Sequence, residues 1–366
     1  MLADAEIVPY LIEQGLVSAR SVVAGDVVLT TVSRRNRSCK VTCAEGPSYF
    51  VKQGVDDERR ATVAREAAVH RHLERDPTMA GYLPEVYLVD DDSSVFVSEL
   101  CGAGEDVREG QVRSSRFSLL QPRSLGQALA RLGDVRATAE LRTVLGAGPA
   151  WSPWVLSLHR PRPELLRQSS AAGIDLVRMI QGFPVLTDHF DLLREEWTAS
   201  SPVHGDLKAE NCIPVAKPGS TRRTRLKIVD WECATMGDPA WDVGSAFADY
   251  LAFWVRSIPV AARASPGQFL DVARHPLARM QGPMGIFWSS YAATARIAPP
   301  AAEALLLRSV RHAAARLVQS AFEQLQAAPA LTAHAVCMVQ LALNMLERPA
   351  QAGAHLLGVP AFTHAA

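Results

Sequence analysis

Three oxygen-bearing side chains, Asp206, Asn211 and Asp230, stand in two short segments whose spacing suits proton and metal chemistry. Asp206 and Asn211 lie five residues apart in the segment VHGDLKAEN (203–211), where a turn follows an apolar approach. Asp230 ends the short strand-like run KIVD at 227–230. One carboxylate can orient a hydroxyl and accept its proton, while two oxygen ligands can hold Mg²⁺ on nucleotide phosphates. The pattern therefore predicts phosphoryl transfer.

The conjunction of HGDxxxxN with an apolar-apolar-Asp strand end resembles the catalytic core of the aminoglycoside phosphotransferase/choline kinase-like family. These proteins are relatives of protein kinases and have HGD in place of HRD. The resemblance implies an α+β, bilobal protein-kinase-like fold and an ATP-dependent phosphotransferase with an alcohol group as acceptor. It implies that Asp206 is the catalytic carboxylate, that Asn211 and Asp230 are Mg²⁺ ligands, and that His204 shapes the loop. A lone HGD would be only a turn with an Asx cap, so the conjunction carries this interpretation.

We expect residues 1–101 to form a small, β-rich nucleotide-binding lobe and residues 102–366 to form a large helical lobe. The helical lobe contains the catalytic loop at 203–244 and a basic, acceptor-side helical subdomain at 251–366. Runs of residues that favour β-strands predict four strands, at 27–32, 39–43, 48–52 and 95–100.

Lys52 ends one of these strands, and the helical segment 61–73 carries Glu66. A kinase needs a cation that reaches the α- and β-phosphates from such a strand, held by a carboxylate on the following helix. We therefore expect a Lys52–Glu66 pair, with a solvated lysine as the alternative. Lys52, Asp206, Asn211 and Asp230 should converge on one cleft.

The polar turn 33–38 occupies the place of the phosphate-covering loop but contains no glycine. Ser33 and Ser38 can present hydroxyl and backbone N–H groups to phosphate, although a basic surface turn is an equal alternative. Adenine is expected to form hydrogen bonds with backbone groups from Glu99 to Cys101. This placement rests only on the order of the expected elements along the chain.

The remainder is predicted to be mostly helical, with helices at 124–132, 134–145, 174–180 and 185–197 separated by Pro and Gly. The segment GDPAWDVG (237–244) then begins another helix. The resemblance implies that Asp242 braces the catalytic loop, while Asp238 is suited to be an N-cap before Pro239. No APE-like activation segment follows, which argues against an ordinary protein kinase.

Composition sets further limits. The formal net charge is zero, so no global field favours nucleic acid. The six cysteines contain no CxxC pair and indicate reduced thiols of a cytoplasmic protein. The N-terminus lacks a signal-peptide pattern, and the longest apolar stretch, 335–346, is too short to cross a membrane.

The charge of the C-terminal part bears on the acceptor. From Leu251 onward there are nine arginines and no lysine against four acids. Arg308, His312 and Arg316 fall on one helix face, which we expect to contribute to acceptor binding unless it is a solvated face. The sign is wrong for a polycationic aminoglycoside and suits an acidic peptide or an anionic small molecule.

Two short segments, WVLSLHRP (154–161) and QLALNMLERP (340–349), look like phosphotransferase-type proteins of thioamitide and class V lanthipeptide (RiPP) biosynthesis. This similarity implies phosphorylation of Ser/Thr in a ribosomal precursor peptide, after which a separate lyase eliminates phosphate to give dehydroamino acids. Two alternatives remain. One is a small-molecule kinase for an aminoglycoside, sugar or amino alcohol, and the other is a nucleotide-binding pseudokinase that acts as a scaffold.

Overall fold

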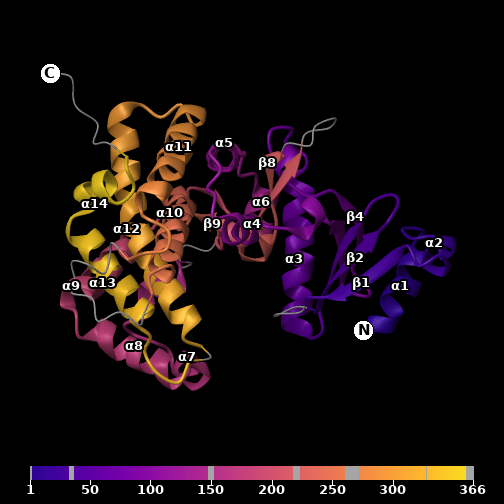
Figure 1. Cartoon of the computed structure of the whole chain (residues 1–366), viewed down its shortest axis with the longest axis horizontal. Coiled ribbons are helices and arrows are strands. Elements are labelled where there is room, and N and C mark those ends of the chain that lie inside the picture. The colour runs from indigo at the N-terminus through magenta and orange to yellow at the C-terminus, as the bar shows by residue number, and fades with distance from the viewer. Residues whose placement is uncertain are drawn as a thin grey trace. The chain divides into compact units, whose positions relative to one another are not determined.

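The computed structural model describes residues 2–32, 37–146, 152–216, 223–259, 272–326 and 328–359. The chain forms two compact units, each built from several segments (Figure 1). Unit 1 comprises Met1–Arg113, Ala137–Gly146 and Glu210–Ala234, and unit 2 comprises Ser114–Arg136, Ala147–Ala209 and Thr235–Ala366. Residues 210–234 therefore belong with the N-terminal part of the chain. The lobe boundary expected at residue 101 stays a prediction.

Unit 1 contains a five-stranded antiparallel sheet of order β1-β2-β3-β5-β4. Side chains alternate between the two faces of a strand, so β3 contributes side chains to both faces of the sheet. Tyr49 and Val51 join a core with the helix α1, whereas Lys52 points to the helix α3, whose residues Val63 and Ala67 pack on Phe96. The bounds are β1 Val27–Thr31, β2 Arg37–Cys43, β3 Tyr49–Gln53, β4 Val86–Asp90, β5 Val95–Glu99, α1 Asp4–Glu13 and α3 Asp57–Leu73.

Unit 1 also contains a two-stranded antiparallel hairpin formed by β7 and β8. In this hairpin Cys212 of β7 pairs with Ile228 of β8 in antiparallel register. Residues 217–222, which connect the two strands, lie outside the described residues. The remaining elements of unit 1 are α2 Ala19–Val23, η1 Ala80–Tyr82, η2 Cys101–Gly104, α4 Val107–Ser114, α6 Ala139–Leu145, β7 Cys212–Ala216, β8 Arg223–Ile228 and η5 Trp231–Cys233, and η4 Ala209–Asn211 joins the two units.

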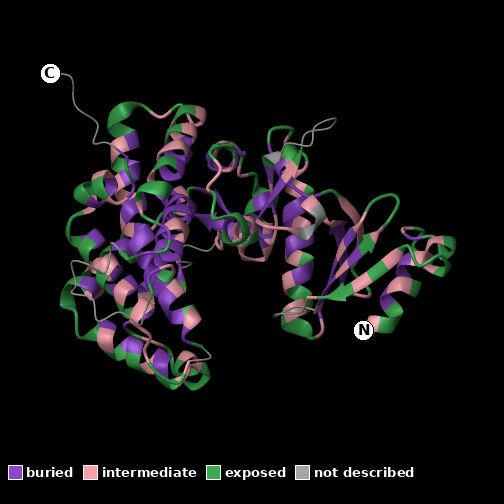
Figure 2. Cartoon of the chain, viewed as in Figure 1, coloured by how far each residue is buried: buried purple, intermediate pink, exposed green. Residues whose placement is uncertain are grey.

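Unit 2 is mainly helical. Helix α10 packs on α12, α5 packs on α11, and α12 also packs on α13. Figure 2 shows buried residues along much of α10 and α12. The elements are α5 Leu120–Asp134, η3 Trp154–Ser157, α7 Pro163–Gln168, α8 Ala171–Gln181, α9 Pro184–Glu195, β6 Ser201–Val203, β9 Thr235–Gly237, α10 Pro239–Arg256, α11 Ala278–Thr294, α12 Pro299–Gln324, α13 Ala333–Glu347 and α14 Pro349–His355.

Local sequence explains where several helices begin. The helix expected at 134–145 starts only at Ala139, because the Thr138 side chain accepts a hydrogen bond from the Leu141 amide and caps it there. Asp238 caps α10 in the same way, accepting from the Ala240 amide at 2.9 Å, with Pro239 in the first turn. Across the described parts of the chain, no helix combines the length and the apolar character that a membrane crossing needs.

Candidate active site

In unit 1, Lys52 lies between two carboxylates. Its Nζ is 2.7 Å from Glu66 Oε2 and 2.5 Å from Asp230 Oδ1, and only 7% of the residue is exposed. Burial disfavours the charge on Lys52, but Glu66 and Asp230 outweigh it, so the pKa of Lys52 is raised. The expected Lys52–Glu66 pair is therefore present, and Lys52 is a fixed cation beside Asp230.

Asp230 has an unusual backbone. Its φ of 69° lies in the left-handed region, which Asp and Asn tolerate better than most residues. The hairpin of β7 and β8, which ends just before Asp230, also positions Asn211, because the Val229 amide donates a hydrogen bond to the Asn211 carbonyl at 3.0 Å. Strand pairing thus brings together two residues that are 19 positions apart in the sequence.

The donor set around Asp230 fits a hard cation. Single carboxylate oxygens of Glu66, Asp230 and Glu232 lie within 4.8 Å of one another. Mg²⁺ prefers oxygen ligands of this kind and is usually bound by one or two carboxylates together with phosphate. The set therefore fits Mg²⁺, with Asn211 and Asp230 as the ligands that the sequence predicts.

The segment expected to contact adenine follows β5. The Glu99 carboxylate accepts from Lys227 Nζ at 2.5 Å, and the Glu99 amide donates to the Glu85 carbonyl at 2.8 Å. Burial raises the pKa of the Cys101 thiol to about 12, so this thiol is neutral. The side chain of Glu99 is thus paired with Lys227 within unit 1, and the adenine contact expected at the backbone from Glu99 to Cys101 stays a prediction.

Of the two predicted phosphate-loop serines, Ser33 lies outside the described residues. Ser38 is buried in β2 and pairs in register with Lys52 of β3. Its carbonyl accepts from the Val32 amide at 2.9 Å.

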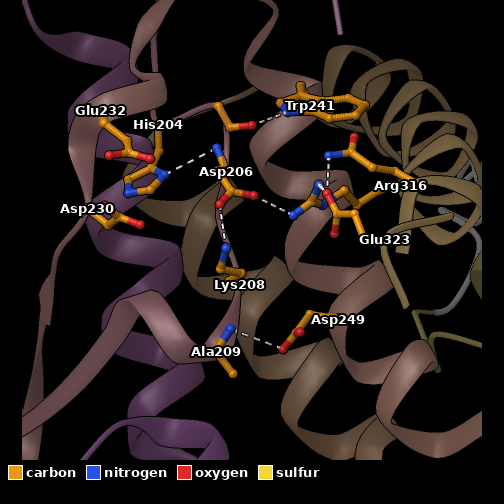
Figure 3. Close-up of polar contacts among 12 residues, drawn as sticks. His204, Asp206, Lys208, Ala209, Asp230, Glu232, Trp241, Asp249, Arg316 and Glu323 are labelled. Carbon is orange, nitrogen blue, oxygen red and sulfur yellow. Dashed lines mark hydrogen bonds and ion pairs between the residues drawn. The ribbon is translucent and has the colours of Figure 1, made fainter. Parts of the chain in front are cut away.

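In unit 2, the backbone of the HGD turn at 204–206 is held by side chains of α10. Asp242 Oδ2 accepts from the His204 amide at 2.6 Å and Asp242 Oδ1 accepts from the Gly205 amide at 3.0 Å. The indole of Trp241 donates to the Gly205 carbonyl at 3.0 Å (Figure 3). Gly205 has φ of 82°, a conformation that favours glycine. The geometry agrees with the bracing role that the resemblance implies for Asp242.

The loop presents Asp206 between two cations. Asp206 Oδ1 accepts from Arg316 Nη2 at 2.6 Å, and Asp206 Oδ2 accepts from Lys208 Nζ at 2.5 Å (Figure 3). Burial opposes the negative charge, but Arg316 and Lys208 outweigh it and hold the pKa of Asp206 below its ordinary value. Asp206 is therefore an ionised carboxylate with 22% of its side chain exposed.

The expected acceptor face of α12 needs correction. His312 is 1% exposed and its ring packs edge-on to Trp197 and Trp241, and burial lowers its pKa to about 3. It is a neutral core residue, not a group presented to an acceptor. Arg308 lies 3.0 Å from Asp238, and Arg316 is used by Asp206. Internal acids thus pair with both arginines of this face, and 34% of the Arg308 side chain stays exposed.

Three features of the site were not predicted from the sequence. These are the contact of Lys208 with Asp206, the contact of Arg316 with Asp206, and the proximity of Glu232 to Asp230. Lys208 and Glu232 are each two residues from a predicted site residue, so proximity in sequence was an available signal. Arg316 is 110 residues from Asp206 and had no such signal. The convergence of Lys52, Asn211 and Asp230 with Asp206 involves both units and stays a prediction.

The sheet with its Lys–Glu–Asp cluster and the helical unit with its HGD loop define a protein-kinase-like fold, as the sequence predicts. Residues 31–276 match the phosphotransferase enzyme family (APH). The chain therefore belongs to this family of enzymes, which transfer phosphate to hydroxyl groups.

Solved structures of low sequence identity share the fold. Choline kinase LicA from Streptococcus pneumoniae has a TM-score of 0.50 and 12% identity, over 92% of this chain and 99% of that one. Choline kinase from Cryptosporidium parvum has a TM-score of 0.51 and 10% sequence identity, and the match covers 97% of this chain and 98% of that one. The GDP complex of a point mutant of aminoglycoside 2'-phosphotransferase-IIIa has a TM-score of 0.52 and 14% sequence identity, and the match covers 96% of this chain and 99% of that one. No curated protein sequence matches this chain.

Proposed function

We propose that this phosphotransferase uses Mg-ATP and transfers the γ-phosphate to a hydroxyl group of its acceptor. The observation that carries the proposal is the buried Lys52 cation held by Glu66 and Asp230, because this is the arrangement with which kinases bind nucleotide phosphates. The GDP complex of one structural neighbour makes GTP the alternative donor.

Each residue has a distinct task in this reaction. Lys52 binds the α- and β-phosphates, and Asn211 and Asp230 would hold Mg²⁺. Bound by these residues, Mg²⁺ would supply positive charge that offsets the charge of the phosphates. Asp206 orients the acceptor hydroxyl and receives its proton while the hydroxyl oxygen bonds to the γ-phosphorus and the bond to the bridging oxygen of ADP breaks.

For the acceptor, we propose Ser/Thr of a ribosomal precursor peptide of acidic character, as in RiPP biosynthesis in the cytoplasm. Such a phosphate ester would next be consumed by an elimination reaction on a separate lyase. The excess of arginine from Leu251 onward supports an anionic acceptor. The names of the structural neighbours instead favour a small-molecule hydroxyl, such as that of choline or an aminoglycoside. This second candidate is retained for that reason.

Mass spectrometry of acceptors after incubation with Mg-ATP or Mg-GTP tests the proposal. We expect an added phosphate on a peptide Ser/Thr, no product after chelation of Mg²⁺, and at least a ~10²-fold lower turnover in Asp206→Asn, the low end for a positioned acid–base group. Nucleotide binding should survive in that variant because Lys52, Asn211 and Asp230 are untouched. Binding of nucleotide without transfer to any acceptor would favour the pseudokinase alternative.

A further inference from the structure

Arg316 is a deeply buried cation that contacts Asp206. It is 4% exposed and comes from α12, far along the chain from the loop that carries Asp206. Lys208, the other cation, belongs to the loop itself and is 30% exposed on its side chain. The two oxygens of the catalytic carboxylate are thus held from two different elements of unit 2.

Arg316 is itself fixed by its own helix. Its Nη1 lies 3.5 Å from Glu323 Oε1, and Glu323 Oε1 also accepts from Gln319 Nε2 at 2.8 Å. Spacings of three, four and seven residues place these side chains along one face of α12. Helix α12 packs on α10, which carries the loop-bracing Asp242. The orientation of the guanidinium is therefore set by the same packing that sets the loop.

We propose that Arg316 is a positioning residue, which fixes the rotation of the Asp206 carboxylate for the incoming hydroxyl and keeps it ionised; this inference rests on the proposed function. The last torsion of an Asp side chain is broad, so a carboxylate needs a partner to hold its plane. A buried planar guanidinium provides that direction, whereas the flexible Lys208, with 30% of its side chain exposed, provides charge with little direction.

The arrangement leaves room for the reaction. An ionised carboxylate offers about four lone-pair positions, so Asp206 can keep both cations and still accept from a hydroxyl. The guanidinium beside Asp206 also helps to hold its pKa low. Removal of Arg316 should therefore raise the pKa of Asp206 and move the acid limb of the rate profile to higher pH, because protonated Asp206 cannot receive the proton.

The experiment compares Arg316→Met, which keeps length without charge, with Arg316→Lys, which keeps charge without the planar fork. The matched control is Arg311→Met, which removes an arginine of the same helix that pairs with Glu196 at 3.1 Å. We expect Arg316→Met to lower kcat ~10²-fold, the usual effect of misplaced reacting groups, with nucleotide KM unchanged and the acid limb moved upward. Arg316→Lys should keep the acid limb near that of the wild type and recover part of kcat.

A titration of ¹³C-labelled Asp carboxyls by NMR gives a readout that needs no turnover, with Asp206 assigned from its absence in Asp206→Asn. The Asp206 pKa should rise in Arg316→Met and stay unchanged in Arg311→Met. An unchanged pKa in folded Arg316→Met would overturn the inference. A higher acceptor KM at constant kcat would also overturn it and make Arg316 an acceptor contact. If the wild type transfers no phosphate at all, the proposed function fails, while the titration still decides whether Arg316 controls Asp206.

Discussion

Asp230 meets two demands at once, one on its charge and one on its backbone. Its carboxylate neutralises the buried Lys52, and its φ of 69° turns the chain at the end of β8. Asn tolerates this left-handed conformation, but Ala does not adopt it readily. Charge and conformation can therefore be separated by substitution.

We expect Asp230→Asn and Asp230→Ala both to weaken Mg-nucleotide binding at least ~10-fold, since each loses the anionic ligand. Asp230→Ala should also unfold at a lower temperature than Asp230→Asn, because it adds backbone strain. Calorimetric titration and thermal unfolding measure the two effects. The exposed Asp92→Asn serves as the control in unit 1. Unaltered nucleotide affinity in both variants would remove Asp230 from the metal site.

Asp242 allows a second test at this scale. It is 3% exposed and each of its oxygens accepts a backbone amide of the catalytic loop. In Asp242→Asn, one acceptor becomes an NH₂ group that faces an amide donor. We expect a loss of about 1–3 kcal/mol in the free energy of unfolding and a lower kcat. Denaturant unfolding checks this against the exposed Asp188→Asn, which should change neither quantity.

The residues differ in how far the sequence predicted them. Lys52 and Glu66 were predicted as a pair because a kinase needs a lysine at such a strand end held by a carboxylate on the next helix, and the ion pair is present. Asp242 was predicted only through the motif that the family shares. The Arg316–Asp206 contact could not be predicted, because it depends on how α12 packs on α10, and no local pattern encodes that packing.

At the scale of elements, strong periodic patterns were reliable. The strands predicted at 27–32, 39–43, 48–52 and 95–100 are found as β1, β2, β3 and β5. The strand β4 was not predicted, because all five of its residues are partly exposed at the edge of the sheet and show no alternation of buried and exposed positions. The other edge strand, β1, was predicted all the same, because its run of residues at 27–32 strongly favours a strand.

Helices α10 and α12 approach each other closely at Gly244. A Cβ at this position would lie 2.6 Å from the Ser309 carbonyl oxygen and 2.8 Å from the Ala313 nitrogen. We expect Gly244→Ala to cost about 1–3 kcal/mol in the free energy of unfolding, because backbone must move to admit the methyl group. It should also lower kcat, since α10 carries Asp242 and α12 carries Arg316.

Gly133→Ala is the matched control for that variant. Gly133 lies in α5, and a Cβ there would meet nothing within 4 Å. Replacement of a helical glycine by alanine should stabilise the protein by about 0.5–1 kcal/mol without loss of activity. Equal stability of Gly244→Ala and Gly133→Ala would show that the α10–α12 contact can yield without cost.

At the scale of the whole molecule, a charge sum over one stretch of sequence misstates the local field. Residues 251–366 carry five more arginines than acids. The structure pairs Arg308 with Asp238, Arg311 with Glu196 and Arg316 with Asp206. All three acids lie outside that stretch, so each of them offsets one arginine of the excess. The sequence predicted the sign of this charge but overstated its size.

The remaining sign still makes a prediction about the acceptor. We expect an acidic Ser peptide to be phosphorylated faster than a polycationic aminoglycoside, with a neutral polyol between them. Surface charges act over about a Debye length, ~8 Å at physiological salt. Relative to the neutral polyol, added salt should therefore slow the acidic peptide and speed the aminoglycoside. Measurement of kcat/KM for the three acceptors from low to high salt tests both trends. Efficient phosphorylation of the aminoglycoside, slowed by salt, would show that the acceptor meets carboxylates and that the arginine excess has no part in substrate choice.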